Sequence, residues 1–284
     1  MTIKIVTDTG SDLPMDLAST HDIRTVPINV MFGDQIYKDG VDITPEEFNN
    51  KMFIDGLLPK TSQPSPSDFI PIYENLAAQG HSILSIHLSS KLSGTYNSAI
   101  QAADSVRSST GASIRVVDSL KASIPMTLGV LAAAKHLSDN PSISLEDLGS
   151  YTEDVLSRTT VYVALDTLEY LQKGGRIGKA SALLGGMLRI KPILSIQDGE
   201  VVPVAKCRSL NQSLDQISQI VADQGKLLSA ALIYNTDLET KELLRTELLS
   251  HNPGLPLIET TFSPSIGTYV GPNAIGVATL PDLG

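Results

Sequence analysis

A hydroxyl-rich stretch between an apolar strand and a helix carries the side chains best suited to bind an anion. It runs from residue 89 to residue 99, SSKLSGTYNSA, directly after a strand expected at Ser82–Leu88. Apolar residues then recur at helical spacing, so the helix is expected to begin near Ser93 or Gly94. The first N–H groups of a helix lack partners within it, and glycine allows close approach to the backbone. Ser93 and the amides after Gly94 can therefore hold an anion, or Ser93 can serve simply as an N-cap.

Two further segments combine groups of the same kind. The segment Thr61–Ser65, TSQPS, places three hydroxyls and an amide ahead of a helix, where a ligand site and a capped turn are equal interpretations. Residues 168–179 form a basic, glycine-rich turn in which Arg176 follows two glycines. This turn is not a phosphate loop, because Lys173 replaces the first glycine of that motif and Ala180 replaces its hydroxyl residue. The turn either holds an anion or carries cations that face solvent.

Two acidic residues follow the first expected strand. Asp8 and Asp12 lie in the segment TDTGSD, residues 7–12, at the carboxyl end of that strand. Proteins of the α/β class bind ligands at this edge of the sheet, but Asp and Ser also form turns without any ligand. Both interpretations of the acidic pair stay open.

Several common catalytic motifs are absent from the sequence. It contains neither the G-x-S-x-G nor the S-x-x-K pattern of serine enzymes. Its five histidines show no H-x-x-x-H or H-x-H spacing and its one cysteine, Cys207, stands alone, so no zinc or iron site is expected. No two glycines are separated by a single residue, which excludes the dinucleotide fingerprint G-x-G-x-x-G. A stand-alone hydrolase or phosphoryl-transfer enzyme that uses Ser93 on a small ester or phosphate is an alternative function, but it lacks a recognisable base.

Charge and composition narrow the class of protein further. The 284 residues are 42% hydrophobic and carry a formal net charge of −10, which argues against a nucleic-acid partner and against stable binding to an anionic membrane. Transient contact with a membrane is compatible with this charge. A single cysteine excludes an internal disulfide, the N-terminus has the pattern of a strand rather than a signal peptide, and no apolar run reaches the ~18 residues of a membrane span. We therefore expect a cytoplasmic protein.

These segments are embedded in two different patterns of strands and helices. The first half alternates strands with helices, as α/β proteins do, with strands expected at Ile3–Thr7, Thr25–Met31, Ile83–Leu88 and Ile114–Val117. The second half adds a hairpin with an Asp198-Gly199 turn, two helices, and strands at Val161–Leu165 and at residues 230–234, 257–262 and 274–280. We predict an α/β protein of two domains. Residues 1–158 form a three-layer domain with a mainly parallel sheet, and residues 159–284 form a domain with a mixed sheet.

The order and spacing of three segments resemble the DegV family. These segments are Thr61–Ser65, Leu92–Tyr96 and Leu171–Ile177. The opening Ile5–Pro14, the pair Asp118-Ser119 and the stretch Gly267–Gly276 are similar to the family too. The resemblance therefore spans essentially the whole chain.

The resemblance implies a function and a set of partners. DegV proteins are bacterial two-domain α/β proteins that hold one long-chain fatty acid, and several serve as the binding subunit of fatty acid kinase. By this resemblance, the chain holds a palmitate-like or oleate-like fatty acid between its domains and needs no cofactor or metal ion. The catalytic subunit of the kinase then converts the presented carboxylate to an acyl phosphate for phospholipid metabolism. The chain is expected to be a carrier without catalytic activity of its own.

The resemblance also assigns residues to the fatty acid head group. Thr61 and Ser93 match the family hydroxyls that bind the carboxylate, and both are expected on turns. Gly94 matches the turn that supplies a backbone contact, and Ser62 stands beside Thr61 as a supporting residue. Hydroxyls and amides bind a carboxylate without adding charge to the site. No catalytic residue is expected.

Tyr269 and Arg176 complete the expected site. Family members often carry a histidine before Gly-Pro-Gly near the C-terminus, where this sequence has Tyr269 and replaces the last glycine by Asn273. A tyrosine hydroxyl can donate a hydrogen bond but is uncharged at neutral pH, unlike a protonated imidazole. Arg176 matches the family arginine after Gly-Gly. It is expected at the mouth of the site or on the surface that faces the kinase, and the alternative is direct pairing with the carboxylate.

Overall fold

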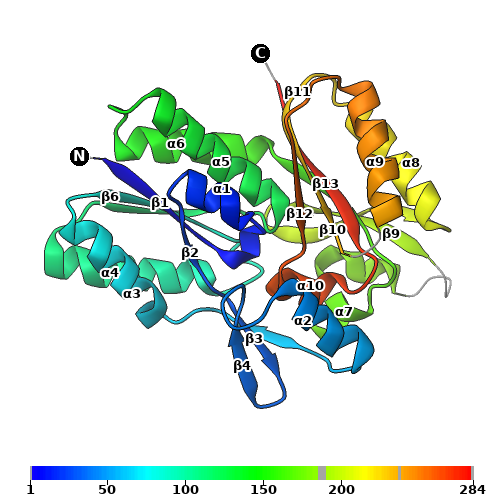
Figure 1. Ribbon diagram of the computed structural model, residues 1–284, viewed down its shortest axis with the longest axis horizontal. Coiled ribbons are helices and arrows are strands. Elements are labelled where there is room, and N and C mark those ends of the chain that lie inside the picture. The colour runs from blue at the N-terminus through cyan, green and yellow to red at the C-terminus, as the bar shows by residue number, and fades with distance from the viewer. Residues whose placement is uncertain (1, 185–189, 236–237, 283–284) are drawn as a thin grey trace.

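The described residues of this computed structural model, 2–184, 190–235 and 238–282, form three β-sheets with helices packed around and between them (Figure 1). The first part of the chain builds a parallel sheet and the last part builds a mixed sheet. A small antiparallel sheet, which includes the hairpin of β3 and β4, lies at the lower edge of Figure 1.

The parallel sheet has four strands in the order β2-β1-β6-β7. They are β1 (Ile3–Asp8), β2 (Arg24–Val26), β6 (Ser82–His87) and β7 (Ile114–Asp118). Because side chains alternate between the faces of a strand, Ile83 of β6 belongs to the hydrophobic cluster on one face of the sheet and Leu84 to the cluster on the other.

Helices cover both faces of this sheet. One face carries α3 (Pro66–Ala78) and α4 (Thr95–Thr110), and the other carries α1 (Met15–Thr20), α5 (Ile124–Asp139) and α6 (Leu145–Arg158). Strands buried on both faces have nearly continuous apolar sequences, as in Ser82–His87, all of whose residues are buried. The arrangement confirms the predicted three-layer α/β architecture.

The second sheet is mixed and has the order β10-β9-β8-β13-β11-β12. Its strands are β8 (Thr160–Ala164), β9 (Lys191–Gln197), β10 (Glu200–Cys207), β11 (Leu227–Tyr234), β12 (Leu257–Thr261) and β13 (Ile275–Pro281). Only the pair β11 and β12 is parallel among the described strand pairs of this sheet. Helices α8 (Leu210–Ala222) and α9 (Leu238–His251) pack on one face.

The predicted hairpin of this sheet is confirmed. Strands β9 and β10 pair antiparallel across a two-residue turn, with Gln197 opposite Glu200. Asp198 and Gly199 both have positive φ, 50° and 81°. Asp-Gly suits such a turn because its twist matches that of the flanking strands.

Helix α5 lies between the two large sheets. Ile124 and Leu128 belong to the cluster that includes Val161 of the mixed sheet, whereas Met126 and Val130 belong to the cluster of the parallel sheet. The strands of the two sheets divide between residues 118 and 160, but α5 contributes to both cores. The domain boundary near residue 158 therefore stays a prediction.

The strand predicted at Thr25–Met31 is wrong, because two strands of different sheets occupy this stretch. Strand β2 ends at Val26, and β3 (Asn29–Phe32) pairs with β4 (Gln35–Lys38) and β5 (Lys60–Ser62). Pro27 lies between them, has no N–H for a ladder and so favours an end to the first strand. Thr61 consequently lies on a strand, opposite Val30, and the expectation of a turn at this position is wrong.

Three short helices complete the frame of the site. They are α2 (Pro45–Asn49), α7 (Glu169–Lys173) and α10 (Pro264–Val270). Residues 168–179, expected as one turn, contain α7 and the start of a 3₁₀-helix at Gly178–Leu183. No helix in the described part of the chain is long and apolar enough to cross a membrane.

Candidate functional site

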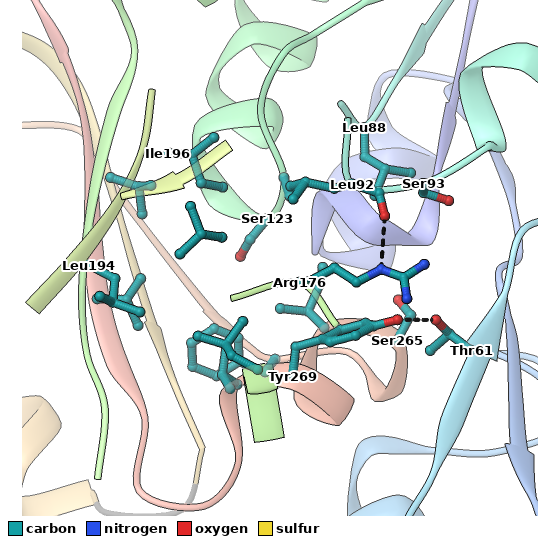
Figure 2. A pocket seen from close by; sticks show the side chains of 18 of the residues that line it. Thr61, Leu88, Leu92, Ser93, Ser123, Arg176, Leu194, Ile196, Ser265 and Tyr269 are labelled. Atoms are coloured by element: carbon teal, nitrogen blue, oxygen red, sulfur yellow. Dashed lines mark hydrogen bonds between the residues drawn. The ribbon is translucent and has the colours of Figure 1, made fainter. Parts of the chain in front are cut away.

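A cavity lies between the carboxyl edge of the parallel sheet and one face of the mixed sheet (Figure 2). Strand order reverses between β1 and β6, and α/β proteins bind ligands beyond the carboxyl ends of strands at such a point. Leu88 and Ser93 after β6 and Ser123 after β7 line the cavity from this side. The mixed sheet and α10 supply the opposite wall, with Val163, Leu194, Ile266 and Tyr269 among the lining residues.

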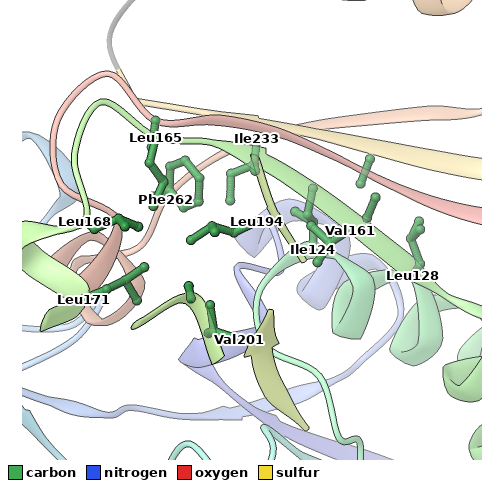
Figure 3. Packing of buried hydrophobic residues seen from close by; sticks show 14 of the residues in the cluster. Ile124, Leu128, Val161, Leu165, Leu168, Leu171, Leu194, Val201, Ile233 and Phe262 are labelled. Carbon is green, nitrogen blue, oxygen red and sulfur yellow. The ribbon is translucent and has the colours of Figure 1, made fainter. Parts of the chain in front are cut away.

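Most of the cavity wall is apolar. The lining residues Val161, Leu165, Leu171, Leu194, Val201 and Phe262 also belong to one hydrophobic cluster, which Figure 3 shows. Contact with apolar walls favours hydrocarbon, because it removes apolar surface from water. The wall therefore suits a hydrocarbon ligand.

Polar side chains gather at the other end of the cavity. The hydroxyl oxygens of Thr61 and Tyr269 lie 2.6 Å apart and share a hydrogen bond, although 208 positions separate them in the sequence (Figure 2). Arg176 lies over the Tyr269 ring, with its Cζ 5.5 Å from the ring centre. Its Nε donates to the Leu92 carbonyl at 3.1 Å, and one terminal nitrogen donates to the Gly174 carbonyl at 2.7 Å. The structure thus brings together Thr61, Tyr269 and Arg176.

Ser93 and Gly94 lie at the start of α4, as predicted. The helix begins at Thr95 with Gly94 as its N-cap residue. Ser93 Oγ accepts from the Thr95 N–H at 3.3 Å and lies 2.9 Å from Thr95 Oγ1, and Ser93 also lines the cavity. The hydroxyl therefore bonds the first helical turn while it faces the ligand space. Gly94 is not among the lining residues, but it adjoins Gln63, which is.

Four polar lining residues were missed as site residues. Ser62 was predicted and lines the cavity, but so do Gln63, Ser123, Ser195 and Ser265. Ser123 has φ 66° and ψ −149°, an uncommon conformation for a residue with a side chain, and its N–H donates to the Gly10 carbonyl at 2.6 Å. Its place after β7, at the ligand edge of the sheet, was the available sequence signal.

Asp12 anchors α10 rather than lining the cavity. Its carboxylate accepts from Ser123 Oγ and, at 2.9 Å, from the Ser263 N–H at the N-cap of α10. Asp39 accepts from the Ser265 N–H at 3.1 Å. Burial raises the pKa of Asp12 to about 7 and that of Asp39 to about 6, although hydrogen bonds oppose the change. The two carboxyls thus hold the helix that carries Tyr269 against the parallel sheet.

The raised pKa of Asp12 predicts that the free energy of unfolding falls as pH rises from about 4 to about 7. In that window the folded protein retains a proton on Asp12 that the unfolded chain, with a pKa of 3.8, has already lost. The Asp12 contribution is complete below pH 4 and amounts to a few kcal/mol, since one pKa unit is worth about 1.4 kcal/mol. Denaturant titrations of the wild type and Asp12→Asn at pH 5 to 8 measure the slope, which the substitution should reduce.

The exposed Asp16 provides the matched control. Asp16→Asn removes the same charge from a solvated position and should leave the slope as in the wild type. An equal slope in wild type and Asp12→Asn would contradict the assignment of the titration to Asp12.

Asp8 belongs to a separate buried chain of hydrogen bonds. Its carboxylate contacts His87 Nδ1 at 2.8 Å, His87 Nε2 contacts Ser85 Oγ at 2.7 Å, and that hydroxyl contacts Tyr73 at 2.7 Å. All four side chains are buried and none lines the cavity. The chain therefore links β1, β6 and α3 internally, and Asp8 also caps the turn at Gly10.

The site offers no base to Ser93. None of the described residues that line the cavity is a histidine, aspartate or glutamate, and the recorded partner of Ser93 Oγ is Thr95. Nor do the described residues contain a group of three or more His, Cys, Asp or Glu side chains placed to hold a metal ion. The geometry suits binding of an amphipathic acid. The apolar wall can contact its hydrocarbon, the hydroxyls of Thr61, Ser93 and Tyr269 can donate to its acid group, and the exposed Arg176 lies at the mouth.

Comparison with known proteins places this chain among relatives of the same length. A family model described as an uncharacterised protein of the DegV family matches residues 2–282. A DegV domain-containing protein from Caldanaerobacter subterraneus is 34% identical over 278 residues, 97% of each chain. Protein DegV from Bacillus subtilis is 30% identical over 280 residues, 98% of each chain.

Solved structures of similar proteins share the fold. A DegV family protein from Thermus thermophilus, described by its fatty acid binding, superposes with a TM-score of 0.90 at 33% identity, covering 99% of this chain and 100% of that one. A stearic acid-binding protein from Eubacterium ventriosum superposes with a TM-score of 0.91 at 27% identity, covering 98% of each chain.

Proposed function

The chain belongs to the DegV family, and from that premise we propose that it binds one long-chain fatty acid and presents the carboxylate to a partner kinase. The observation that carries the proposal is the cavity between the two sheets, lined mostly by apolar residues and at one end by Thr61, Ser93 and Tyr269. We place the acyl tail against the apolar wall and the carboxylate at the hydroxyls. Phosphorylation by the kinase would yield an acyl phosphate, and the chain itself would act as a cytoplasmic carrier.

The tail supplies the affinity in this proposal. Burying roughly fifteen methylenes at ~0.8 kcal/mol each offers on the order of 12 kcal/mol before ordering costs. This gain exceeds the several kcal/mol that removing the carboxylate from water costs. The ligand is therefore a palmitate-like or oleate-like acid rather than a short one.

The head group must be compensated for leaving water. A carboxylate removed from water costs several kcal/mol unless donors replace the lost hydrogen bonds. Thr61, Ser93 and the backbone at Gly94 are the donors we assign, with Ser62 in support and Tyr269 as partner of Thr61. These donors are neutral, so a carboxylate oxygen keeps the electron density needed to attack the γ-phosphate of a nucleotide bound by the kinase.

Native mass spectrometry of the protein purified from bacteria tests the function. We expect one bound fatty acid per chain, whose mass reports its length and unsaturation. A protein that carries no fatty acid and takes up neither labelled palmitate nor labelled oleate would rule out the carrier function.

Arg176 is predicted to serve phosphoryl transfer rather than binding. Its side chain lies at the exposed mouth and is already bonded to two carbonyls, so Arg176→Ala should leave fatty acid affinity nearly unchanged. A positive charge there orients the encounter with the kinase and with a charged acyl phosphate. Phosphorylation should slow in Arg176→Ala, and added salt should shrink the difference by slowing the wild type.

Lys173→Ala is the matched control for Arg176. Lys173 is a cation of the same segment that already pairs with Glu169 at 2.6 Å, so its loss should change phosphorylation little. If Arg176→Ala abolishes fatty acid binding while kinase docking is normal, the partner-facing role is wrong and Arg176 pairs directly with the carboxylate.

A further inference from the structure

Gln63 lies between β5 of the small sheet and α3, at the polar end of the cavity. It follows Ser62 of β5 and precedes Pro64, which favours an extended backbone at position 63. Its side chain lines the cavity.

The amide of Gln63 lies against Gly94. A β-carbon added to Gly94 would stand 2.6 Å from Gln63 Nε2 and 2.8 Å from Gln63 Cδ, closer than any real contact. Glycine at position 94 therefore makes room for this amide. The amide thus lies against the residue that follows Ser93, the hydroxyl assigned to the carboxylate.

Gln63 is exposed, and its side-chain amide, unlike the side chains of its polar neighbours, has no partner, while its backbone carbonyl accepts from Asn29 Nδ2 at 3.5 Å. Thr61 bonds Tyr269, Ser93 bonds Thr95 and Arg176 bonds Leu92. Within the described part of the chain, neither the nitrogen nor the oxygen of the Gln63 amide makes a hydrogen bond. An amide nitrogen has two N–H donors, and a carboxylate has about four acceptor positions, more than the two hydroxyls can fill.

We propose that Gln63 selects the acid head group, by donating an N–H to the carboxylate oxygen that Thr61 leaves free. This inference rests on the proposed binding of a fatty acid. A site built with a donor for each oxygen discriminates against a ligand that lacks one of them. Gln63 is therefore a specificity-determining residue for a carboxylate over an alcohol of equal chain length.

Two substitutions whose side chains are similar in length to glutamine test this assignment. For each variant, the affinities for palmitate and for 1-hexadecanol are measured by displacement of labelled oleate from delipidated protein. Gln63→Met keeps the bulk against Gly94 but has no donor, so affinity for palmitate should fall about tenfold while that for the alcohol stays unchanged. Gln63→Glu places a carboxylate beside the ligand's carboxylate, so affinity for palmitate should fall more than tenfold. Affinity for the alcohol should hold or rise in Gln63→Glu, because the new carboxylate accepts from its O–H.

A purely structural role for Gln63 would weaken both ligands equally. Equal losses, or no loss in either variant, would overturn the assignment. Gln101→Glu, on the exposed part of α4 away from the cavity, makes the same change of charge and should alter neither affinity. If the wild type itself binds no palmitate, the proposed function fails first, and that outcome is distinct from an unchanged ligand preference.

Discussion

Replacing Val163 by tryptophan is expected to abolish fatty acid loading, because position 163 lines the apolar part of the cavity. Val163 is half-buried on β8, packs against the hydrophobic cluster of the cavity and adjoins Gly276 of β13. An indole ring at this position fills space that the acyl chain needs. If it displaces four methylenes, about 3 kcal/mol of burial is lost, which is roughly two hundredfold in affinity.

The measurement for Val163→Trp is uptake of labelled palmitate, with circular dichroism melts to confirm folding. Overpacking costs about 1–3 kcal/mol of stability, which a domain of ordinary stability tolerates. Tyr162→Trp is the matched control, because Tyr162 packs on the opposite face of the same strand with the cluster that includes Leu214 of α8. Normal palmitate uptake by folded Val163→Trp would show that the acyl chain does not lie in this cavity.

The double substitution Thr61→Ala with Ser93→Ala, which removes both hydroxyls, is the second change with a large expected effect on palmitate binding. Each hydroxyl should contribute about 1–2 kcal/mol to carboxylate binding. The double substitution should cost at least the sum, because the second loss leaves the carboxylate with few donors. We expect a weakening of palmitate binding of roughly thirtyfold or more and a comparable loss of phosphorylation.

The double variant should still fold and still bind the tail. Thr61 and Ser93 are half-buried, and each substitution removes a hydroxyl with one side-chain partner, the half-buried Tyr269 for Thr61 and the buried Thr95 for Ser93. The matched control is Ser108→Ala with Thr110→Ala, two hydroxyls at the far end of α4. The head-group assignment is wrong if the Thr61 and Ser93 double variant binds palmitate and is phosphorylated as well as the wild type.

The sequence by itself determined most of the local structure. Alternating strands and helices predicted the parallel sheet, and the Asp198-Gly199 turn predicted the hairpin of β9 and β10, because these signals depend on neighbouring residues alone. The turn at Ser93 and Gly94 was predicted in the same way and lies at the start of α4.

Tertiary structure decided how distant segments meet. Thr61 lies on an edge strand of a small sheet that no periodic pattern announced, since β5 has three residues and pairs with β3 thirty positions earlier. Its contact with Tyr269 depends on the docking of α10, which Asp12 and Asp39 hold through Ser263 and Ser265. Such contacts depend on how sheets and helices pack, and a sequence pattern of period two or 3.6 carries no information about which elements pack together.

The same reason explains the missed polar residue at position 63. Gln63 was counted only as the amide of a segment that could be a ligand site or a capped turn, and only the approach of the turn at Gly94 gives its amide a place beside the ligand space. Helix α5 likewise contributes residues to two different cores, which its sequence alone did not indicate. Local propensity determined the elements of this protein, and packing between sheets created the cavity, because a cavity wall is assembled from residues far apart in the chain.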